Sequence, residues 1–145
     1  MDYLAHKQAI AEQLGRYSLS FDSHDADAWA AIFTDEGVFE VRVSGGSGFL
    51  FRAQGTQQLR AFAANAPNLI HHITGVVFDE ILSDSARTRA TVLGTWASPE
   101  DGSPALYTHG TYEQRWSNTS GTWKLAYQLF ISHGYHKAAF QTAAQ

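Results

Sequence analysis

The stretch LIHHITGVVFDEIL, residues 69–82, begins the part of the chain that decides the fold. It is rich in β-branched residues, and further strand-like runs follow at about residues 88–97, 106–116 and 123–133. Short stretches rich in Ser, Asp, Gly or Pro separate these runs, so each pair of consecutive strands is expected to be antiparallel. The C-terminal half of the chain is therefore predicted to form a sheet of long strands.

The N-terminal half carries helical periodicity instead. Apolar residues recur at helical spacing over residues 3–21, and residues 25–33 and 55–65 indicate two further helices. Between these last two, residues 38–43 alternate as a strand, and a glycine-rich turn leads into residues 49–51. This order predicts an α+β fold, a curved, cone-shaped antiparallel sheet (a half-barrel) with three helices packed on its concave face around an interior pocket.

Length and composition narrow the class of protein. The chain has 145 residues, which suits a single domain spanning residues 1–145 with 135–145 as a C-terminal tail. Its net charge of −4 argues against nucleic-acid binding, and the absence of cysteine excludes disulfides and thiolate chemistry. No signal-peptide pattern and no membrane-length apolar run are present, so we expect a soluble, cytoplasmic protein without a membrane partner.

Residues able to carry out acid–base chemistry gather near the end of the first predicted helix and the start of the first long strand. Tyr17 and Asp22 lie at and just beyond the helix end, and His71 and His72 open the strand. An Asp and a His form a minimal general base, because the carboxylate fixes the imidazole tautomer and stabilises the imidazolium. Adjacent histidines on a strand point to opposite faces, and periodicity alone does not decide which one faces inward.

The remaining polar motifs give weaker evidence for a functional site. His109 shares a strand face with Tyr107 and is a candidate for the pocket wall, although an exposed histidine explains the pattern equally well. His133 and His136 have a His-x-x-His spacing without a third ligand, so no metal site is predicted. The glycines of residues 45–48 lack the Lys and following helix of a phosphate-binding loop. No cofactor is expected.

Several segments together resemble the SnoaL-like branch of the nuclear transport factor 2-like superfamily, and within it the scytalone dehydratase and hexachlorocyclohexane dehydrochlorinase type. These segments are residues 17–25 with Trp29, residues 32–39, residues 71–75 and residues 121–125. The resemblance covers about residues 3–133 and implies the cone-shaped fold. The superfamily includes dehydratases, isomerases, cyclases and non-catalytic binding modules, so the fold alone does not name a reaction.

The resemblance also implies site residues. In dehydratase-like members an Asp near the end of the first helix pairs with a His at the start of the third strand, and that His removes a proton from carbon. Their positions correspond to Asp22 and His71 here, with Tyr17 as the electrophile or acid. The residues then expected to contact substrate are His72, His109, Phe21, Trp29, Phe39, Trp96 and Tyr127.

The chain departs from scytalone dehydratase at several positions. That enzyme has a Tyr in place of Phe21, another in the first strand, which here reads FEV at 39–41, and a His in the fourth strand, which here reads GTWA at 94–97. Many relatives also carry an Arg where this chain has Gln128. Charge that develops during a reaction is therefore expected to meet Tyr17, His109 or backbone donors.

The preferred hypothesis is a cofactor-independent lyase of the dehydratase or elimination type. In it, the pair formed by His71 and Asp22 removes a proton from a small hydrophobic cyclic or aromatic substrate in an apolar cavity, and water, halide or a carbonyl fragment leaves. One alternative is an isomerase or cyclase that uses the same pair. The other is a non-catalytic module that binds a small ligand, in which the pair is only a buried hydrogen bond.

The assembly state and the tail are also predicted. Trp96, Trp116 and Trp123 are assigned to the exposed face of the sheet, which indicates a homo-oligomer, with a trimer favoured over a dimer. The tail from residue 135 to 145 is expected either to close the pocket or to fray.

Overall fold

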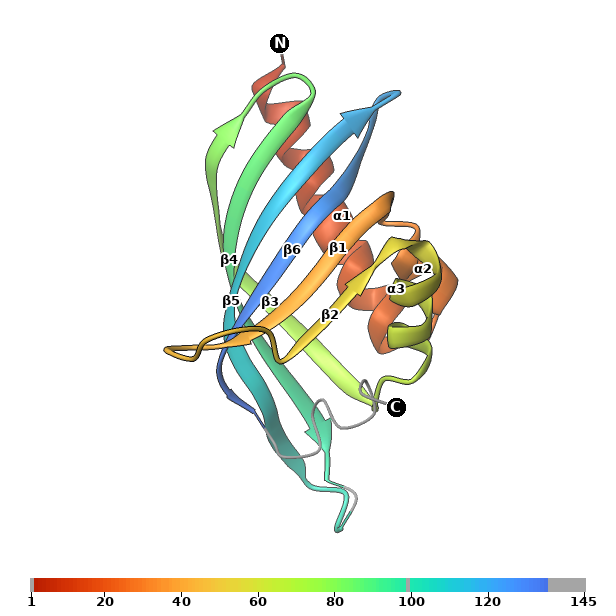
Figure 1. Cartoon of the computed structure of the whole chain (residues 1–145), viewed down its shortest axis with the longest axis vertical. Coiled ribbons are helices and arrows are strands. Elements are labelled where there is room, and N and C mark those ends of the chain that lie inside the picture. Colours follow the sequence, from red (N-terminus) through yellow and green to blue (C-terminus); the bar gives the residue numbers. More distant parts are fainter. Residues whose placement is uncertain (1, 99, 136–145) are drawn as a thin grey trace.

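The structure, a computed structural model, describes residues 2–98 and 100–135 (Figure 1). The elements in chain order are α1 (Tyr3–Asp22), α2 (Ala26–Ala30), β1 (Phe33–Val43), β2 (Phe51–Gln54), α3 (Gly55–Ala64), β3 (Leu69–Ile81), β4 (Ser85–Ala97), β5 (Pro104–Thr119) and β6 (Thr122–Tyr135). The strands form one sheet in the order β2-β1-β6-β5-β4-β3, and Figure 1 shows it curving around the helices. The predicted α+β class with a curved sheet is confirmed.

The sheet is mixed, and the prediction of a wholly antiparallel sheet was wrong. Strand β1 runs parallel to β6, whereas the other neighbouring strands pair antiparallel. Turn signals reveal only pairings between consecutive strands, and β1 and β6 come from distant parts of the chain. The parallel register places Phe39 directly beside Gln128, so β1 and β6 jointly form one side of the concave face.

Helix α1 sets the position of the residues that follow it. The Asp2 side chain caps the helix by accepting a hydrogen bond from the backbone N–H of Ala5. The buried residues of α1 are Ile10, Leu14, Tyr17 and Phe21, as the apolar spacing predicts. Just past the helix end, His24 has a φ of 61° and turns the chain into α2. The last turn of α1 is thereby held over the start of β3.

Trp29 is the centre of an aromatic cluster beneath the helices. It is fully buried, and its ring contacts those of Tyr17, Phe21, Phe33, Phe39 and Phe62. Burial of so large a ring is among the strongest stabilising contributions available to a domain of this size. The cluster is the support on which the cavity-facing rings rest.

Trp29→Ala is expected to lower the free energy of unfolding by about 3 to 5 kcal/mol, because it removes a buried indole and leaves a cavity. Urea denaturation followed by circular dichroism measures this. Trp96→Ala is the matched control, since Trp96 is only partly buried against the core. A loss for Trp29→Ala no larger than that of the control contradicts the structural role given to Trp29.

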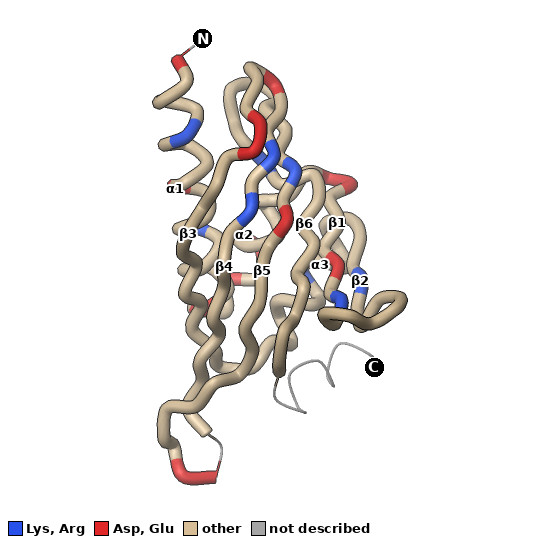
Figure 2. The backbone as a smooth tube through the Cα atoms, turned by 90° about the vertical axis from the view of Figure 1, so that its left-hand side faces the viewer, with Lys and Arg blue, Asp and Glu red and all other residues tan. Residues whose placement is uncertain are grey.

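The outer face of the sheet is charged along β3, β4 and β5, where Figure 2 shows acidic and basic residues close together. Arg89 forms a two-pronged ion pair with Asp79, and Arg87 pairs with Glu80. Because these pairs are exposed, each contributes little to stability. Their main effect is to keep this face polar.

The tryptophans that were assigned to the exposed face lie elsewhere. Trp116 and Trp123 are each only 2% exposed and belong to the core, because their strand positions face the helices. Trp96 is partly buried and packs against Tyr107, with ring centroids 4.7 Å apart. These residues therefore give no support for an oligomer interface, and the homo-oligomer stays a prediction.

Two further expectations concern the C-terminal tail and membrane-spanning segments, and the structure addresses them only within the described residues. Strand β6 ends at Tyr135, and the rest of the predicted C-terminal tail lies outside the described residues. Within residues 2–98 and 100–135, none of the helices is both long and apolar enough to cross a membrane.

Candidate active site

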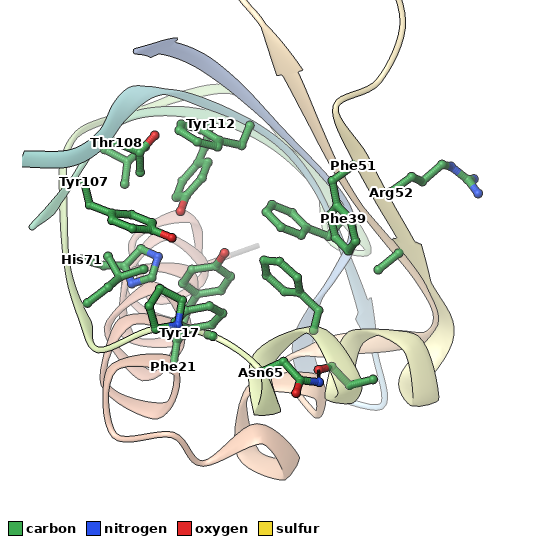
Figure 3. Close-up of a pocket in the computed structure, with 18 of the residues that line it drawn as sticks. Tyr17, Phe21, Phe39, Phe51, Arg52, Asn65, His71, Tyr107, Thr108 and Tyr112 are labelled. Carbon is green, nitrogen blue, oxygen red and sulfur yellow. Dashed lines mark hydrogen bonds between the residues drawn. The ribbon is translucent and has the colours of Figure 1, made fainter. Parts of the chain in front are cut away.

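A cavity of about 280 Å³ lies between α1, α3 and the concave face of the sheet (Figure 3). Most of its wall is apolar, formed by Phe21, Phe39, Phe51, Phe62, Leu69, Val92 and Phe130 among others. Figure 3 shows His71, Tyr17, Tyr107 and Tyr112 gathered on one side of this space, opposite Phe39 and Phe51. The cavity thus has an apolar body with a polar end at His71, and Arg52, Gln58 and Asn65 also belong to its lining.

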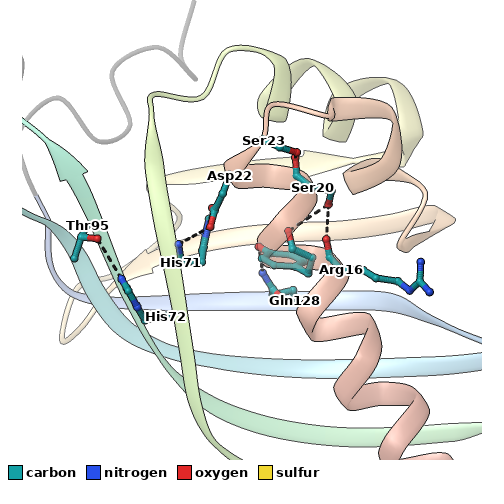
Figure 4. A network of polar contacts seen from close by, with 9 residues as sticks. Arg16, Ser20, Asp22, Ser23, His71, His72, Thr95 and Gln128 are labelled. Atoms are coloured by element: carbon teal, nitrogen blue, oxygen red, sulfur yellow. Dashed lines mark hydrogen bonds and ion pairs between the residues drawn. The ribbon is translucent and has the colours of Figure 1, made fainter.

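His71 and Asp22 form a hydrogen-bonded pair at that polar end (Figure 4). His71 Nδ1 lies 2.7 Å from Asp22 Oδ1, and the backbone N–H of His71 donates to Asp22 Oδ2 at 2.9 Å. A carboxylate only accepts hydrogen bonds, so Nδ1 carries the proton and Nε2 is left as the basic nitrogen. The side chains are 9% and 13% exposed, which shields the pair from most solvent.

The position of His71 follows from the local structure of β3. The residue pairs with Gly94 on β4, where an added Cβ would lie 2.9 Å from a Leu69 methyl carbon and 3.1 Å from one of Thr108. Glycine at this position lets β4 lie close to the residues that line the cavity on both sides of it. The imidazole ring then meets Tyr17 and Phe21 edge to face.

Three phenols share the polar end with the histidine. Burial raises the pKa of Tyr17 to about 12, an effect opposed by hydrogen bonds with Tyr112 and Gln128. Burial likewise raises the pKa of Tyr107 to about 12, and burial together with the neighbouring Tyr17 raises the pKa of Tyr112 well above its usual value. All three therefore stay protonated at neutral pH and can donate hydrogen bonds.

The raised pKa of Tyr17 predicts a loss of stability in alkali. Tyrosines in an unfolded chain ionise near pH 10, so the contribution of Tyr17 is complete below about pH 10 and is lost as the pH rises to about 12. Tyr17→Phe cannot ionise and is expected to lose less stability than the wild type between about pH 9 and 11. Urea midpoints at the two pH values test this, with the exposed Tyr3→Phe as control. Equal losses in wild type and Tyr17→Phe contradict the expectation.

Some of the predicted site residues meet at the cavity. Tyr17, Phe21, Phe39 and His71 line it, and Asp22 reaches it through His71. Trp29, predicted to contact substrate, is instead sealed behind Tyr17 and Phe21. Trp29 lies on the buried side of α2, which directs its ring into the aromatic layer beneath the cavity. Trp96 also does not line the cavity, and its ring packs against Tyr107.

Three other predicted contact residues lie on the opposite, outer face of the sheet. His72 approaches Thr95 at 3.2 Å and His109 stacks on His133, because both follow the alternation of side chains along a strand. Tyr127 donates to Glu40 at 2.7 Å and lies under the Arg115 guanidinium. A register shift between Arg115 and Trp116 reverses the face on which residues of β6 lie, and sequence parity did not reveal it.

Sequence reasoning also missed residues that the structure places at the site. Tyr107 and Tyr112 line the cavity, as do Phe62 from α3 and Phe130 from β6. The alternation on β5 separates Tyr107 from Tyr112, and a register shift between Gly94 and Thr95 brings both to the cavity. Among the described residues, no group of three or more His, Asp or Glu side chains could hold a metal ion.

The family model of the SnoaL-like domain matches residues 2–127 of this chain. The chain belongs to the SnoaL-like family. No curated protein matches it. Among solved structures, a predicted scytalone dehydratase from Novosphingobium aromaticivorans is 19% identical, with 94% of this chain and 91% of that chain covered and a TM-score of 0.78. A type 2 hexachlorocyclohexane dehydrochlorinase is 18% identical, with 93% and 90% covered and a TM-score of 0.75.

Another solved structure shows how broad this SnoaL-like fold is. The β subunit of a predicted aromatic-ring-hydroxylating dioxygenase from Novosphingobium aromaticivorans is 17% identical, with 97% of both chains covered and a TM-score of 0.82. At such identities the likeness concerns the fold only, so the function of this SnoaL-like protein has to be argued from its own side chains.

Proposed function

We propose that this SnoaL-like protein is a cofactor-independent lyase that removes a proton from carbon and eliminates a leaving group from the neighbouring carbon. The observation that carries the proposal is the pair of His71 and Asp22 at the polar end of an apolar cavity. Both oxygens of Asp22 are engaged by His71, which fixes the ring and its tautomer. A histidine held in this way is suited to act as a general base.

The proposed step balances within the substrate and the site. His71 Nε2 takes the proton from carbon, and the electron pair of the broken C–H bond becomes the second bond of a new carbon–carbon double bond. The leaving group departs with its own bonding pair. Asp22 stabilises the imidazolium that forms, and Tyr17 donates a hydrogen bond to the oxygen or halogen that gains charge.

The wall of the cavity narrows the class of substrate. A volume of about 280 Å³ is at the small end of ligand sites, which favours a molecule with one or two rings. Rings from Phe21, Phe39, Phe51 and Phe62 offer apolar and stacking contacts to a cyclic body. We infer a hydrophobic cyclic or aromatic substrate that places its reacting C–H bond at His71.

The two named relatives supply the first compounds to try. Scytalone and hexachlorocyclohexane are each incubated with the purified protein, and the products are analysed by mass spectrometry. Loss of water or of hydrogen chloride, dependent on His71, supports the lyase. The failure of both compounds and of a wider panel of hydroxylated and halogenated rings contradicts it.

An isomerase or cyclase is the second candidate. The observation that favours it is the set of three protonated phenols beside the base, which can stabilise an enolate without any group leaving. The same experiment separates the two, because an isomerised product keeps the mass of its substrate. Binding of panel compounds with no change in them supports a ligand-binding module instead.

A further inference from the structure

A chain of buried hydrogen bonds runs through the core and ends at Tyr17. Trp116 Nε1 donates to Thr88 Oγ1 at 2.9 Å, and Thr88 Oγ1 donates to Gln114 Oε1 at 2.9 Å. Gln114 Nε2 donates to Gln128 Oε1 at 2.7 Å, and Gln128 Nε2 donates to the Tyr17 hydroxyl oxygen at 2.7 Å. We call these five residues the donor chain, and Figure 4 shows Gln128 close to helix α1.

The directions of the hydrogen bonds in the donor chain are mutually consistent. An indole N–H can only donate, so Thr88 accepts from Trp116 and keeps its own proton for the carbonyl oxygen of Gln114. The amide nitrogen of Gln114 then faces Gln128, and the amide nitrogen of Gln128 faces Tyr17. Every bond points from the core to the cavity.

The direction decides what the Tyr17 hydroxyl can do. Its oxygen accepts from Gln128, so its own proton is not used in that bond. The ring of Tyr17 lines the cavity beside His71, so this proton is available to a group bound there.

Burial makes this arrangement specific. Gln128 is 0% exposed and Gln114 is 2% exposed, and burying two primary amides costs free energy unless their hydrogen bonds are satisfied. Two aliphatic side chains of similar size fill the same space without that requirement. A fully connected chain in a dry core also polarises its members, which strengthens the last bond to Tyr17.

We propose that Gln128, oriented by Gln114, Thr88 and Trp116, is a positioning residue that makes the Tyr17 hydroxyl a hydrogen-bond donor to the bound substrate. The effect of this orientation on catalysis rests on the lyase activity proposed above. The orientation of Tyr17 itself belongs to the resting protein and can be measured without a substrate.

Two substitutions of Gln128 separate the effect of hydrogen-bond direction from the effect of side-chain packing. Gln128→Met keeps the length and volume of the side chain and removes the donated hydrogen bond. Gln128→Glu keeps the shape and replaces the donor with an acceptor, so Tyr17 is expected to donate to the new carboxylate instead of to the cavity. Thr88→Val interrupts the donor chain at a distance and serves if a Gln128 variant does not fold.

The first readout is carbon NMR of the protein labelled with ¹³C at the ζ carbon of tyrosine. We expect the Tyr17 resonance to move in Gln128→Met and to move downfield, toward the phenolate position, in Gln128→Glu. Tyr127 is the internal control, because its hydroxyl is bonded to Glu40 on the outer face. A Tyr17 resonance that is the same in wild type, Gln128→Met and Thr88→Val overturns the proposal, whatever the protein catalyses.

The second readout is the kinetics of any compound that the panel shows to be turned over. We expect Gln128→Met to lower kcat about tenfold with KM nearly unchanged, the size of one lost hydrogen bond. Gln128→Glu is expected to lower kcat further. In a Tyr17→Phe background, Gln128→Met is expected to have no additional effect. An undiminished tenfold loss in that background means that Gln128 does not act through Tyr17.

The two readouts also separate the two proposals. Shifted Tyr17 resonances in a protein that turns over no compound leave the positioning of Tyr17 supported and the lyase contradicted. Turnover that depends on His71, with unshifted Tyr17 resonances, supports the lyase and contradicts the positioning of Tyr17 by Gln128.

Discussion

Replacing His71 with alanine is expected to lower kcat roughly 10² to 10⁴-fold, the range that a general base contributes. The reason is that His71 Nε2 is the basic nitrogen left facing the cavity once Asp22 holds Nδ1. Binding of the substrate is expected to change much less, since the aromatic wall of the cavity is left in place. Initial rates on a compound that the wild type turns over give both quantities.

His72→Ala is the matched control for this substitution. The two histidines are neighbours on β3, and His72 points to the outer face, where it approaches Thr95. The control variant is expected to keep its rate within about twofold, far from the roughly 10² to 10⁴-fold loss expected when a general base is removed. If the two variants lose activity equally, the loss comes from damage to β3 and not from a missing base.

Asp22→Asn is expected to produce a loss of similar size, roughly 10² to 10⁴-fold in kcat, although it changes only one atom. Both oxygens of Asp22 accept from N–H groups of His71. An asparagine has one oxygen and one NH₂ group, so one of those N–H groups then meets another donor. The ring is expected to respond by moving its proton from Nδ1 to Nε2, which removes the base.

Nitrogen NMR of His71 checks this explanation independently of the rate. The wild type is expected to show a protonated Nδ1, and Asp22→Asn a protonated Nε2. Asp25→Asn is the control, because Asp25 only caps α2 through the backbone N–H of Ala28, and asparagine caps a helix equally well. An Asp22→Asn protein with the wild-type tautomer and a reduced rate argues that Asp22 acts by its charge alone.

The fold could be predicted in outline because its signals are local. The helical spacing of α1 and the strand-like runs of β3 to β6 are properties of consecutive residues, and the structure confirms the helix and the four strands. The parallel pairing of β1 with β6 is not local. It joins Phe39 to Gln128, which lie far apart in the sequence, and no turn or residue spacing predicts it.

The predictions for the candidate site likewise hold for positions along the chain and fail for the face of a strand. The position of Asp22 at a helix end and of His71 at a strand start agrees with the pair seen in the structure, since the family resemblance fixes both positions along the chain. The errors at His109 and Tyr127 concern which face of a strand a residue occupies. A register shift changed that face at Tyr127, and such shifts depend on how whole strands fit together.

The donor chain shows a further limit of sequence reasoning. Gln114 and Gln128 have nothing in their spacing that indicates contact, and a glutamine on a strand is more often exposed than buried. Sequence comparison drew attention to Gln128 only as a missing arginine. Its hydrogen bond to Tyr17 became visible once β5, β6 and α1 were placed together.

The most direct test of the proposed lyase uses a substrate that carries deuterium at the carbon from which His71 is proposed to take the proton. Turnover of this compound by the wild-type protein is followed by mass spectrometry, with His71→Ala alongside. We expect a product that has lost deuterium together with the leaving group, formed more slowly than from the undeuterated compound, and no such product from His71→Ala. A product that keeps the deuterium, or that His71→Ala forms at the wild-type rate, contradicts the role of His71 as the base.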